Sequence, residues 1–280
     1  MDQRQQHVIA FYTRHPISAK HILGKLEARR GTLDGLRPED LWDHDQDHYG
    51  GLAVNDVLAD RAGLREGMKI ADFCAGLGGP ARYMAHRYRV DVTGVELTTE
   101  RALGAAALTR AVGLDDRVRV LEGDVTAAPI ADGVMDAVVS QEALLHVPDK
   151  AKAVAEAARI LKPGGRLAFT DWIIHRSLDA DEAAAMWTGI AAQTLQTIDA
   201  YRQIMDKAGL DVISVDDLTT DWGIILDERR RMYTKLREDA LKAGMPAGDE
   251  AFYNAYMKLV ELVQARALGG ARFTAQKRLQ

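Results

Sequence analysis

Met68-Lys-Ile-Ala-Asp-Phe-Cys-Ala-Gly-Leu-Gly-Gly-Pro-Ala81 begins as a buried strand and runs directly into a glycine-rich turn. The glycines Gly76, Gly78 and Gly79 follow the apolar residues at once, and a helical pattern begins after them. Glycine allows the backbone to turn tightly and to approach a ligand closely. The first turn of a helix adds N–H groups that have no partner within the helix. The stretch therefore predicts a ligand-binding turn between a strand and a helix.

This strand and turn belong to a long alternation of strands and helices. Strands are expected at residues 90–97, 118–125, 135–141 and 166–172, and helices at residues 99–112 and 149–161. Apolar strands that alternate with helices are typical of a parallel sheet covered on both faces. The rest of the pattern consists of a helix at 198–208, a strand at 211–218, helical periodicity over 221–268 and a short strand at 271–277. The pattern predicts an α/β fold with a helical insertion before its last strand.

The region before the central strand is expected to be largely helical. Pro16 breaks a first helix, Ser18 is a suitable N-cap for a second, and Gly31 is a suitable stop. A further helix at residues 53–64 leads into the central strand.

Composition narrows the class of protein. The chain has 280 residues, 47% of them hydrophobic, a formal net charge of −5 and a single cysteine, Cys74. That length suits one large α/β domain with additions, and the acidic balance argues against a nucleic-acid partner. One cysteine excludes an intrachain disulfide and a cysteine-based zinc cluster. With no signal-like or membrane-spanning apolar run, we expect a soluble cytoplasmic protein without a metal.

The identity of the ligand depends on three carboxylates. Gly76 to Ala81 formally satisfies the dinucleotide pattern G-x-G-x-x-A, with Glu96 as the acid about 20 residues further on. Asp72, however, lies four residues before Gly76 and would repel a pyrophosphate. It suits a ligand that carries an ammonium and a sulfonium, and Asp124 after the third strand can accept from an adenine amino group.

Taken together, these motifs resemble those of class I S-adenosylmethionine-dependent methyltransferases. The matching segments follow the order of that family: Asp72–Gly79, Val95–Leu97, Gly123–Val125, Asp136–Gln141 and Arg159–Gly165. One departure is that Cys74 stands where the family usually has the first glycine of its loop, with Ala75 after it.

The resemblance implies a role for each matched position. Asp72 would hold the methionine amino group beside the backbone of the glycine turn, and Glu96 would bind the ribose hydroxyls. The residues implied to contact the cofactor S-adenosyl-L-methionine are Asp72, Ala75, Gly76, Gly78, Gly79, Glu96, Leu97, Asp124, Val125, Gln141 and Tyr49. Tyr49 is included because Asp47-His-Tyr-Gly-Gly51 resembles a segment that crosses the cofactor in sarcosine/dimethylglycine, tocopherol and sugar methyltransferases.

The family fold implied is a Rossmann-like seven-stranded sheet whose last strand is antiparallel. Residues 1–52 are expected to form a helical cap with the cofactor-covering loop, and residues 53–220 the cofactor-binding α/β core. Residues 221–268 are expected to form a helical lid, and residues 269–280 the final strand of the core.

His146, just past the fourth strand, is the leading candidate for a catalytic base, because ligands of open α/β sheets bind at the carboxyl ends of strands. An equally open role is that it organises the turn before Pro148. Glu142 and Gln141 are further catalytic candidates, as hydrogen-bond partners of the acceptor. The alternative for Glu142 is a carboxylate that satisfies N–H groups at a helix start.

Several other side chains are weighed for the acceptor site. Tyr49 is also a catalytic candidate, and with Trp42 and Trp172 it is a candidate wall for the methyl group, because an aromatic face attracts a cation. Core packing is the simpler interpretation of Trp42. The remaining open candidates are the cavity-facing tyrosines Tyr12, Tyr253 and Tyr256, and the acid-binding arginines Arg82, Arg266 and Arg272. Residues 229–231, three arginines, are most simply a solvated helix face.

The resemblance predicts a methyltransferase that acts on a small-molecule acceptor and favours N-methylation of a small amine such as a glycine derivative. The alternatives are O- or C-methylation of a quinone, polyketide or isoprenoid, an NAD-linked oxidoreductase, and a non-catalytic cofactor-binding protein. We expect no nucleic-acid partner and no membrane span, and a homodimer stays open.

Overall fold

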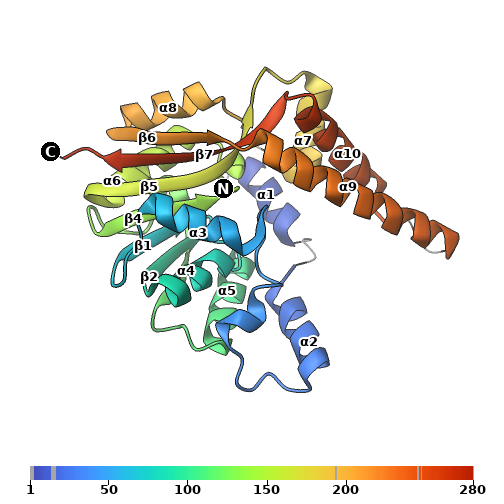
Figure 1. The fold of residues 1–280 in the computed structure, drawn as a ribbon, viewed down its shortest axis with the longest axis horizontal. Helices are drawn as coiled ribbons and strands as arrows, with labels where there is room; N and C mark the ends of the chain where they lie inside the picture. The colour runs from blue at the N-terminus through green and yellow to red at the C-terminus, as the bar shows by residue number, and fades with distance from the viewer. Residues whose placement is uncertain (1–2, 14–16, 193, 245, 247, 280) are drawn as a thin grey trace.

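The computed structural model describes residues 3–13, 17–192, 194–244, 246 and 248–279, and this part of the chain contains one seven-stranded sheet (Figure 1). The strand order is β3-β2-β1-β4-β5-β7-β6. The strands are β1 (Lys69–Phe73), β2 (Asp91–Glu96), β3 (Val118–Glu122), β4 (Met135–Gln141), β5 (Leu161–Ile174), β6 (Leu210–Asp217) and β7 (Leu268–Lys277).

Strands β1 to β5 pair in parallel, whereas β7 runs antiparallel to both β5 and β6. The predicted seven-stranded sheet with an antiparallel last strand is therefore confirmed. The strand order reverses between β1 and β4, and in open α/β sheets ligands bind at such a point, outside the carboxyl ends of the strands. The glycine turn follows β1 at this end of the sheet.

Some strand limits differ from the predicted ones. Strand β3 ends at Glu122, and Val125 lies in a short 3₁₀ turn, because Asp124 caps that turn by accepting from the Thr126 N–H at 2.8 Å. Strand β5 is longer than predicted, since it pairs with β7 as far as Ile174, opposite Leu268.

Helices cover both faces of the sheet. The helices are α1 (Gln3–Thr13), α2 (Ala19–Arg30), α3 (Gly51–Ala62), α4 (Gly79–Tyr88), α5 (Thr99–Ala111), α6 (Lys150–Ile160), α7 (Ala180–Ile190), α8 (Ile198–Lys207), α9 (Thr219–Lys242) and α10 (Glu250–Gln264). Residues of α6 and α8 pack with Ala71 and Phe73, while residues of α3 and α4 pack with Ile70 on the opposite face. The alternation of strand side chains between the two faces explains this division.

The caps of α2 are as predicted. Ser18 Oγ accepts from the His21 N–H at 3.2 Å, and Gly31 ends the helix with a φ of 78°. Pro16, predicted to break the first helix, lies outside the described residues. Helix α7 was not predicted, although Asp179 and Glu182 form a capping box there by exchanging side-chain hydrogen bonds with each other's N–H. This pair of residues could have predicted the start of α7 from the sequence.

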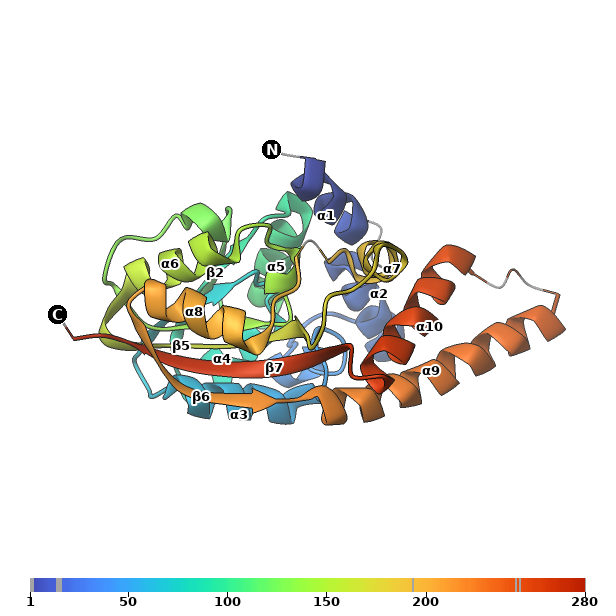
Figure 2. The ribbon, with the colours of Figure 1, turned by 90° about the horizontal axis from the view of Figure 1, so that it is seen from above.

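Helices α9 and α10 form an arm that projects beyond the sheet (Figures 1 and 2). The predicted helical periodicity over 221–268 is thus two helices, of which only the segments nearest the body are buried. Because β7 begins at Leu268, opposite the end of β5, the arm lies at the carboxyl end of the parallel strands. None of the described helices is both long and apolar enough to cross a membrane.

Candidate active site

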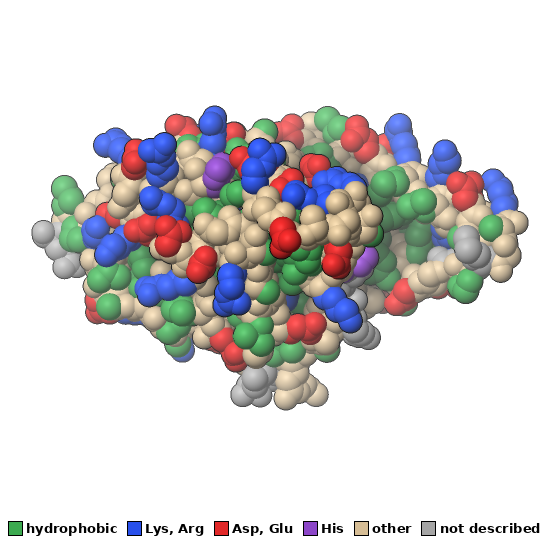
Figure 3. Space-filling view, turned by 90° about the horizontal axis from the view of Figure 1, so that it is seen from below, with side chains coloured by type: hydrophobic (Ala, Val, Ile, Leu, Met, Phe, Trp, Pro, Cys, Tyr) green, Lys and Arg blue, Asp and Glu red, His purple; other side chains and the backbone are tan. Residues whose placement is uncertain are grey.

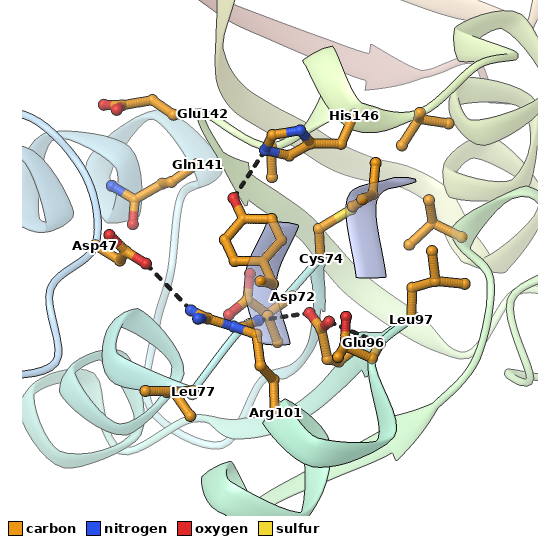
Figure 4. A pocket seen from close by; sticks show the side chains of 18 of the residues that line it. Asp47, Asp72, Cys74, Leu77, Glu96, Leu97, Arg101, Gln141, Glu142 and His146 are labelled. Carbon is orange, nitrogen blue, oxygen red and sulfur yellow. Dashed lines mark hydrogen bonds and ion pairs between the residues drawn. The ribbon is translucent and has the colours of Figure 1, made fainter. Parts of the chain in front are cut away.

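A cavity lies at the carboxyl ends of β1, β2 and β4 (Figure 4). Its floor comes from the glycine turn and the ends of these strands, and its roof from α1 and the loop at residues 45–48. Of the residues predicted to bind the cofactor or to act in catalysis, those that line it are Asp72, Ala75, Gly76, Gly79, Glu96, Leu97, Asp124, Val125, Gln141, Glu142 and His146. Gly78 and Tyr49 are not among the described lining residues.

The glycine turn requires unusual backbone conformations. Gly76 and Gly78 have φ values of 56° and 74°, which glycine adopts without steric cost. Cys74, at the position where the resemblance calls for glycine, has a φ of 59°. A side chain in this left-handed region costs about 1–2 kcal/mol. Gly78 is the N-cap of α4, so it shapes the turn from outside the cavity wall.

Asp72 is a buried carboxylate that lacks a partner. Its side chain is 4% exposed, and its Oδ2 atom has no hydrogen-bond partner among the described residues. Burial, with a smaller contribution from Glu96, raises the pKa of Asp72 to about 7. A buried acceptor without a partner is costly, and a cationic ligand removes that cost. Asp72 therefore fits the ammonium of a bound amino-acid moiety.

Glu96 is held by backbone N–H groups, and Asp124 by a side chain of α1. Glu96 accepts from the N–H groups of Gly76 and Thr98, both at 2.9 Å. Asp124 Oδ2 accepts from Gln5 Nε2 at 2.7 Å, which ties α1 to this wall. Each carboxylate oxygen has a second lone pair, so both side chains remain able to accept from hydroxyl or amino groups of a ligand.

His146 is part of a hydrogen-bonded chain that sequence analysis did not predict. Its Nδ1 lies 3.1 Å from the Ala191 carbonyl oxygen, and its Nε2 lies 2.8 Å from the Tyr12 hydroxyl. Because a carbonyl can only accept, Nδ1 carries the proton and Nε2 accepts from Tyr12. Burial lowers the pKa of His146 to about 4, so the imidazole is neutral. Tyr12, one of the three tyrosines considered for the cavity, lines it.

The turn that carries His146 is supported from below by a buried lysine. Lys150 Nζ donates to the carbonyl oxygens of Leu144 and Val147, at 2.7 and 3.3 Å, and to that of Thr194 at 2.6 Å. These bonds join the His146 turn to the segment after α7. The imidazole and its acceptor, Ala191, are thus held in one rigid unit.

Arg101 is a lining residue that sequence analysis missed. Its guanidinium lies 4.6 Å from the centre of the Tyr12 ring and pairs with Asp47 at 3.1 Å. No local pattern marks it, because Arg101 is one of several polar residues on a helix, and only the packing of α1 over α5 brings it to the cavity.

Gln141 and Glu142 end β4 at the cavity. The Gln141 Oε1 atom is buried and has no hydrogen-bond partner among the described residues. Glu142 has a φ of 52° and accepts from the Tyr49 N–H at 3.0 and 3.2 Å. Burial raises the pKa of Glu142 to about 8. The N–H group that Glu142 binds is thus that of Tyr49, in the loop at residues 45–50, and not one at the start of a helix.

Tyr49 lies beside the cavity, in an aromatic cluster with Trp172 and Trp222. The centre of its ring is 5.8 Å from that of Trp172 and 5.2 Å from that of Trp222. Trp42 is partly exposed and packs against Tyr83, at 5.3 Å between ring centres, and it is not among the described residues that line the cavity.

The three arginines considered for acid binding do not line the cavity. Each is paired with an aspartate, Arg82 with Asp45 at 2.8 Å, Arg266 with Asp217 at 3.1 Å and Arg272 with Asp216 at 3.5 Å. The Arg82–Asp45 pair is buried and anchors the loop that roofs the cavity.

Gly79→Ala is expected to displace that roof. A Cβ atom at Gly79 would collide with the Asp45 carbonyl oxygen, which is backbone and cannot turn away. Such overpacking typically costs about 1–3 kcal/mol. We expect a lower melting temperature and weaker S-adenosylhomocysteine binding, measured by thermal denaturation and calorimetry. Gly24→Ala is the control, since no atom lies within 4 Å of its Cβ position; equal affinities for the two variants would contradict the prediction.

The chain is similar in sequence to known methyltransferases. A family model described as a methyltransferase domain matches residues 71–169. The methyltransferase GfsG of Streptomyces halstedii is 33% identical over 60% of this chain and 62% of its own length. The 27-O-demethylrifamycin SV methyltransferase of Amycolatopsis mediterranei is 31% identical over 68% of this chain and 71% of its own.

Two further proteins extend the comparison. Sarcosine/dimethylglycine N-methyltransferase of Halorhodospira halochloris is 31% identical over 54% of each chain, so this match spans about half of that relative. Phosphoethanolamine N-methyltransferase 2 of Haemonchus contortus, solved in complex with S-adenosyl-L-methionine, shares the fold with a TM-score of 0.73 and 22% identity. That likeness covers 96% of this chain and 59% of the other. This protein therefore belongs to the S-adenosylmethionine-dependent methyltransferase family.

Proposed function

We propose that this protein transfers the methyl group of S-adenosylmethionine to a nitrogen or oxygen atom of a small molecule, with Tyr12 and His146 receiving the proton that the acceptor loses. The observation that carries the proposal is that one cavity holds both a carboxylate suited to a cationic ligand, Asp72, and a neutral imidazole, His146.

In this proposal, the cofactor is bound along the cavity floor. Asp72 holds the ammonium of the methionine part beside the backbone of Gly76 and Gly79. Glu96 accepts from the ribose hydroxyls, next to Leu97. The adenine edge meets Asp124 and Val125. The Asp72 Oδ2 atom supports the assignment, because it is a buried acceptor with no hydrogen-bond partner among the described residues and can accept from a cationic donor.

S-adenosylmethionine supplies an electrophilic methyl group on a sulfonium. The protein's own contribution is to align the acceptor with it and to exclude water, and alignment alone is worth up to about 7–11 kcal/mol of a barrier. Helix α1, the loop at residues 45–50 and the arm are proposed to roof the acceptor chamber. Residues 1–52 and 221–268 thus select the acceptor, while residues 53–220 and 269–280 bind the cofactor.

The proton is proposed to leave through Tyr12. Bound S-adenosylmethionine would supply the methyl group to the acceptor atom, and its sulfur would keep the electron pair of the carbon–sulfur bond. The Tyr12 oxygen takes the proton of the acceptor N–H or O–H while its own proton moves to His146 Nε2. The bond from Nδ1–H to the Ala191 carbonyl keeps the Nε2 lone pair directed at Tyr12.

N-methylation of a small amine is the preferred reaction, supported by the relative named sarcosine/dimethylglycine N-methyltransferase. O-methylation is the second candidate, supported by the relative named for a 27-O-demethylrifamycin.

The family assignment removes the NAD-linked alternative. The acidic net charge of −5 and the single cysteine support an enzyme that acts on free metabolites in the cytoplasm, without a nucleic-acid partner.

A labelled-methyl transfer screen over a metabolite library tests the function. We expect S-adenosylhomocysteine to bind and at least one amine or hydroxyl compound to gain the label. Cofactor binding without transfer to any amine, hydroxyl or carbon acid would contradict the proposal and would favour a non-catalytic cofactor-binding protein.

A further inference from the structure

Helix α9 presents a cation on the face that it turns towards the body of the protein. Trp222, Leu226, Arg229 and Tyr233 recur every three or four residues, so they share one face of the helix. Trp222 and Leu226 are buried, while Arg229 and Tyr233 are partly exposed. Figure 3 shows the surface hollowed between the arm and the body, with hydrophobic side chains in the hollow.

Arg229 differs from the two arginines that follow it. Arg230 and Arg231 both pair with Asp227, at 2.7 and 2.6 Å. Arg229 pairs with no carboxylate among the described residues, and its guanidinium carbon lies 4.5 Å from the centre of the Tyr49 ring. The ring face attracts the cation and orients it but accepts no in-plane hydrogen bond. The N–H donors of Arg229 therefore remain available to an oxyanion.

A second polar group in the same place lacks a partner. Tyr256 is 7% exposed, and its hydroxyl is buried without a hydrogen bond among the described residues. Its ring packs against Tyr233 at 5.1 Å between centres. Burial raises the pKa of Tyr256 to about 12, and Arg229 opposes this rise, so the hydroxyl is protonated and can donate a hydrogen bond. Arg229 and Tyr256 are thus two donors on neighbouring elements.

This pair adjoins the cofactor cavity through Glu142 and Tyr49. Glu142 lines the cavity and accepts from the Tyr49 N–H, while the Tyr49 ring lies under Arg229. Arg229 stabilises the charged form of Glu142, although the two side chains form no ion pair in the described part of the chain. Glu142 and Tyr49 thus connect the lining of the cavity to the residue that lies under Arg229.

We propose that Arg229, assisted by the Tyr256 hydroxyl, binds an oxyanion of the methyl acceptor, either a carboxylate or a phosphate a few atoms from the methylated nitrogen or oxygen. The guanidinium fork matches both groups, and the aromatic cluster beneath it lowers the competing hydration of the charges. The inference rests on the proposed function, since it identifies the class of acceptor for the same cavity.

Two matched acceptor pairs test the inference by turnover. Sarcosine is compared with its amide, and phosphoethanolamine with ethanolamine, so that each pair differs in the oxyanion and the two pairs separate carboxylate from phosphate. We expect the charged member of one pair to have a kcat/KM about tenfold or more above its neutral partner, as one charge-assisted hydrogen bond supplies. Arg229→Gln should remove this preference through KM, with kcat nearly unchanged, and Arg229→Lys should restore part of it.

A binding experiment tests the same site without turnover. Inorganic phosphate and acetate are titrated into the S-adenosylhomocysteine complex, and the fluorescence of Trp172 and Trp222, which contact Tyr49, reports binding. We expect a saturable change with at least one anion that Arg229→Gln abolishes and Tyr256→Phe weakens. Arg231→Gln is the control, because this exposed arginine lies on the same helix but pairs with Asp227.

The outcomes separate this inference from the proposed function. If wild type and Arg229→Gln respond alike to both anions, or if neutral acceptors are used as well as charged ones, the oxyanion site is refuted. Methyl transfer to another acceptor would then leave the proposed function intact. A total absence of transfer, with anion binding that depends on Arg229, would instead support the site and contradict methyl transfer.

Discussion

Asp72→Asn is expected to weaken S-adenosylmethionine binding by about 100-fold or more, because loss of one partner from a buried charge pair costs about 2–5 kcal/mol. The asparagine keeps the shape of the side chain but cannot compensate the ammonium. Calorimetric titration with S-adenosylhomocysteine measures the effect. Asp132→Asn is the control, since that side chain is 81% exposed. An unchanged affinity would refute the role assigned to Asp72.

The same variant is expected to be more stable than the wild type when no cofactor is bound. The pKa of Asp72 is raised in the folded state from its ordinary value of 3.8 to about 7. Between these values the folded protein holds a proton that the unfolded chain releases, so this group makes the free protein less stable as pH rises through that window. Asp72→Asn removes this dependence. The melting temperatures of the two proteins should therefore agree near pH 4, diverge as pH rises towards 7 and differ most above pH 7, with the variant higher.

Tyr12→Phe and His146→Ala are each expected to lower kcat by about 100-fold, the lower range for loss of a general base or its relay. Cofactor affinity should change little, because neither side chain belongs to the wall formed by Asp72, Glu96 and Asp124. Single-turnover methyl transfer and S-adenosylhomocysteine titration measure the two quantities. The double variant should lose no more than either single one, since the two groups act as one unit.

A structural role for His146 makes a different prediction. If the imidazole only organises its turn, His146→Ala should lower the melting temperature, and Tyr12→Phe should leave kcat unchanged. His86→Gln is the control, because His86 lies by Trp42, outside the described lining of the cavity.

The pH dependence of stability also reports on His146. Its pKa falls from 6.5 in the unfolded chain to about 4 in the folded protein. The unfolded chain therefore binds a proton that the folded protein refuses, and the His146 contribution to stability is lost as pH falls from 6.5 towards 4. The chain with His146→Ala should lack this part of the acid sensitivity. Because the imidazole of the wild-type protein is already neutral near pH 6.5, we also expect no rise in the methyl-transfer rate around that pH.

Several residues that line the cavity were predictable from local patterns. Glu96 ends a predicted strand, Asp124 lies just beyond the end of β3, and Asp72 precedes the glycine turn; all three line the cavity. In a parallel sheet the carboxyl ends of neighbouring strands meet at one edge, so residues at those ends converge whatever the loops do. The antiparallel β7 was expected from the family resemblance, and its strand limits followed from its pairing with β5.

The acceptor side was decided by tertiary contacts. Tyr12 reaches His146 across 134 positions of the chain, and Arg229 reaches Tyr49 from a helix that begins after β6. Before folding, each of these side chains is one polar or aromatic residue among many on an amphipathic helix. Helical periodicity determines which face is buried, but the neighbour that the face meets depends on how α1 and α9 dock.

In the glycine turn, some features were predictable from the sequence and others depended on tertiary contacts. The sequence by itself determined that a strand ends there in a turn with positive φ, because only residues such as glycine adopt that conformation cheaply. It also predicted, through Asp72, that the turn accepts a cationic ligand. Only the tertiary structure decided that the Asp72 Oδ2 atom has no hydrogen-bond partner in the described part of the chain and that Glu96 accepts from the Gly76 N–H. Partners of a buried charge are set by the packing of distant elements, which no local spacing encodes.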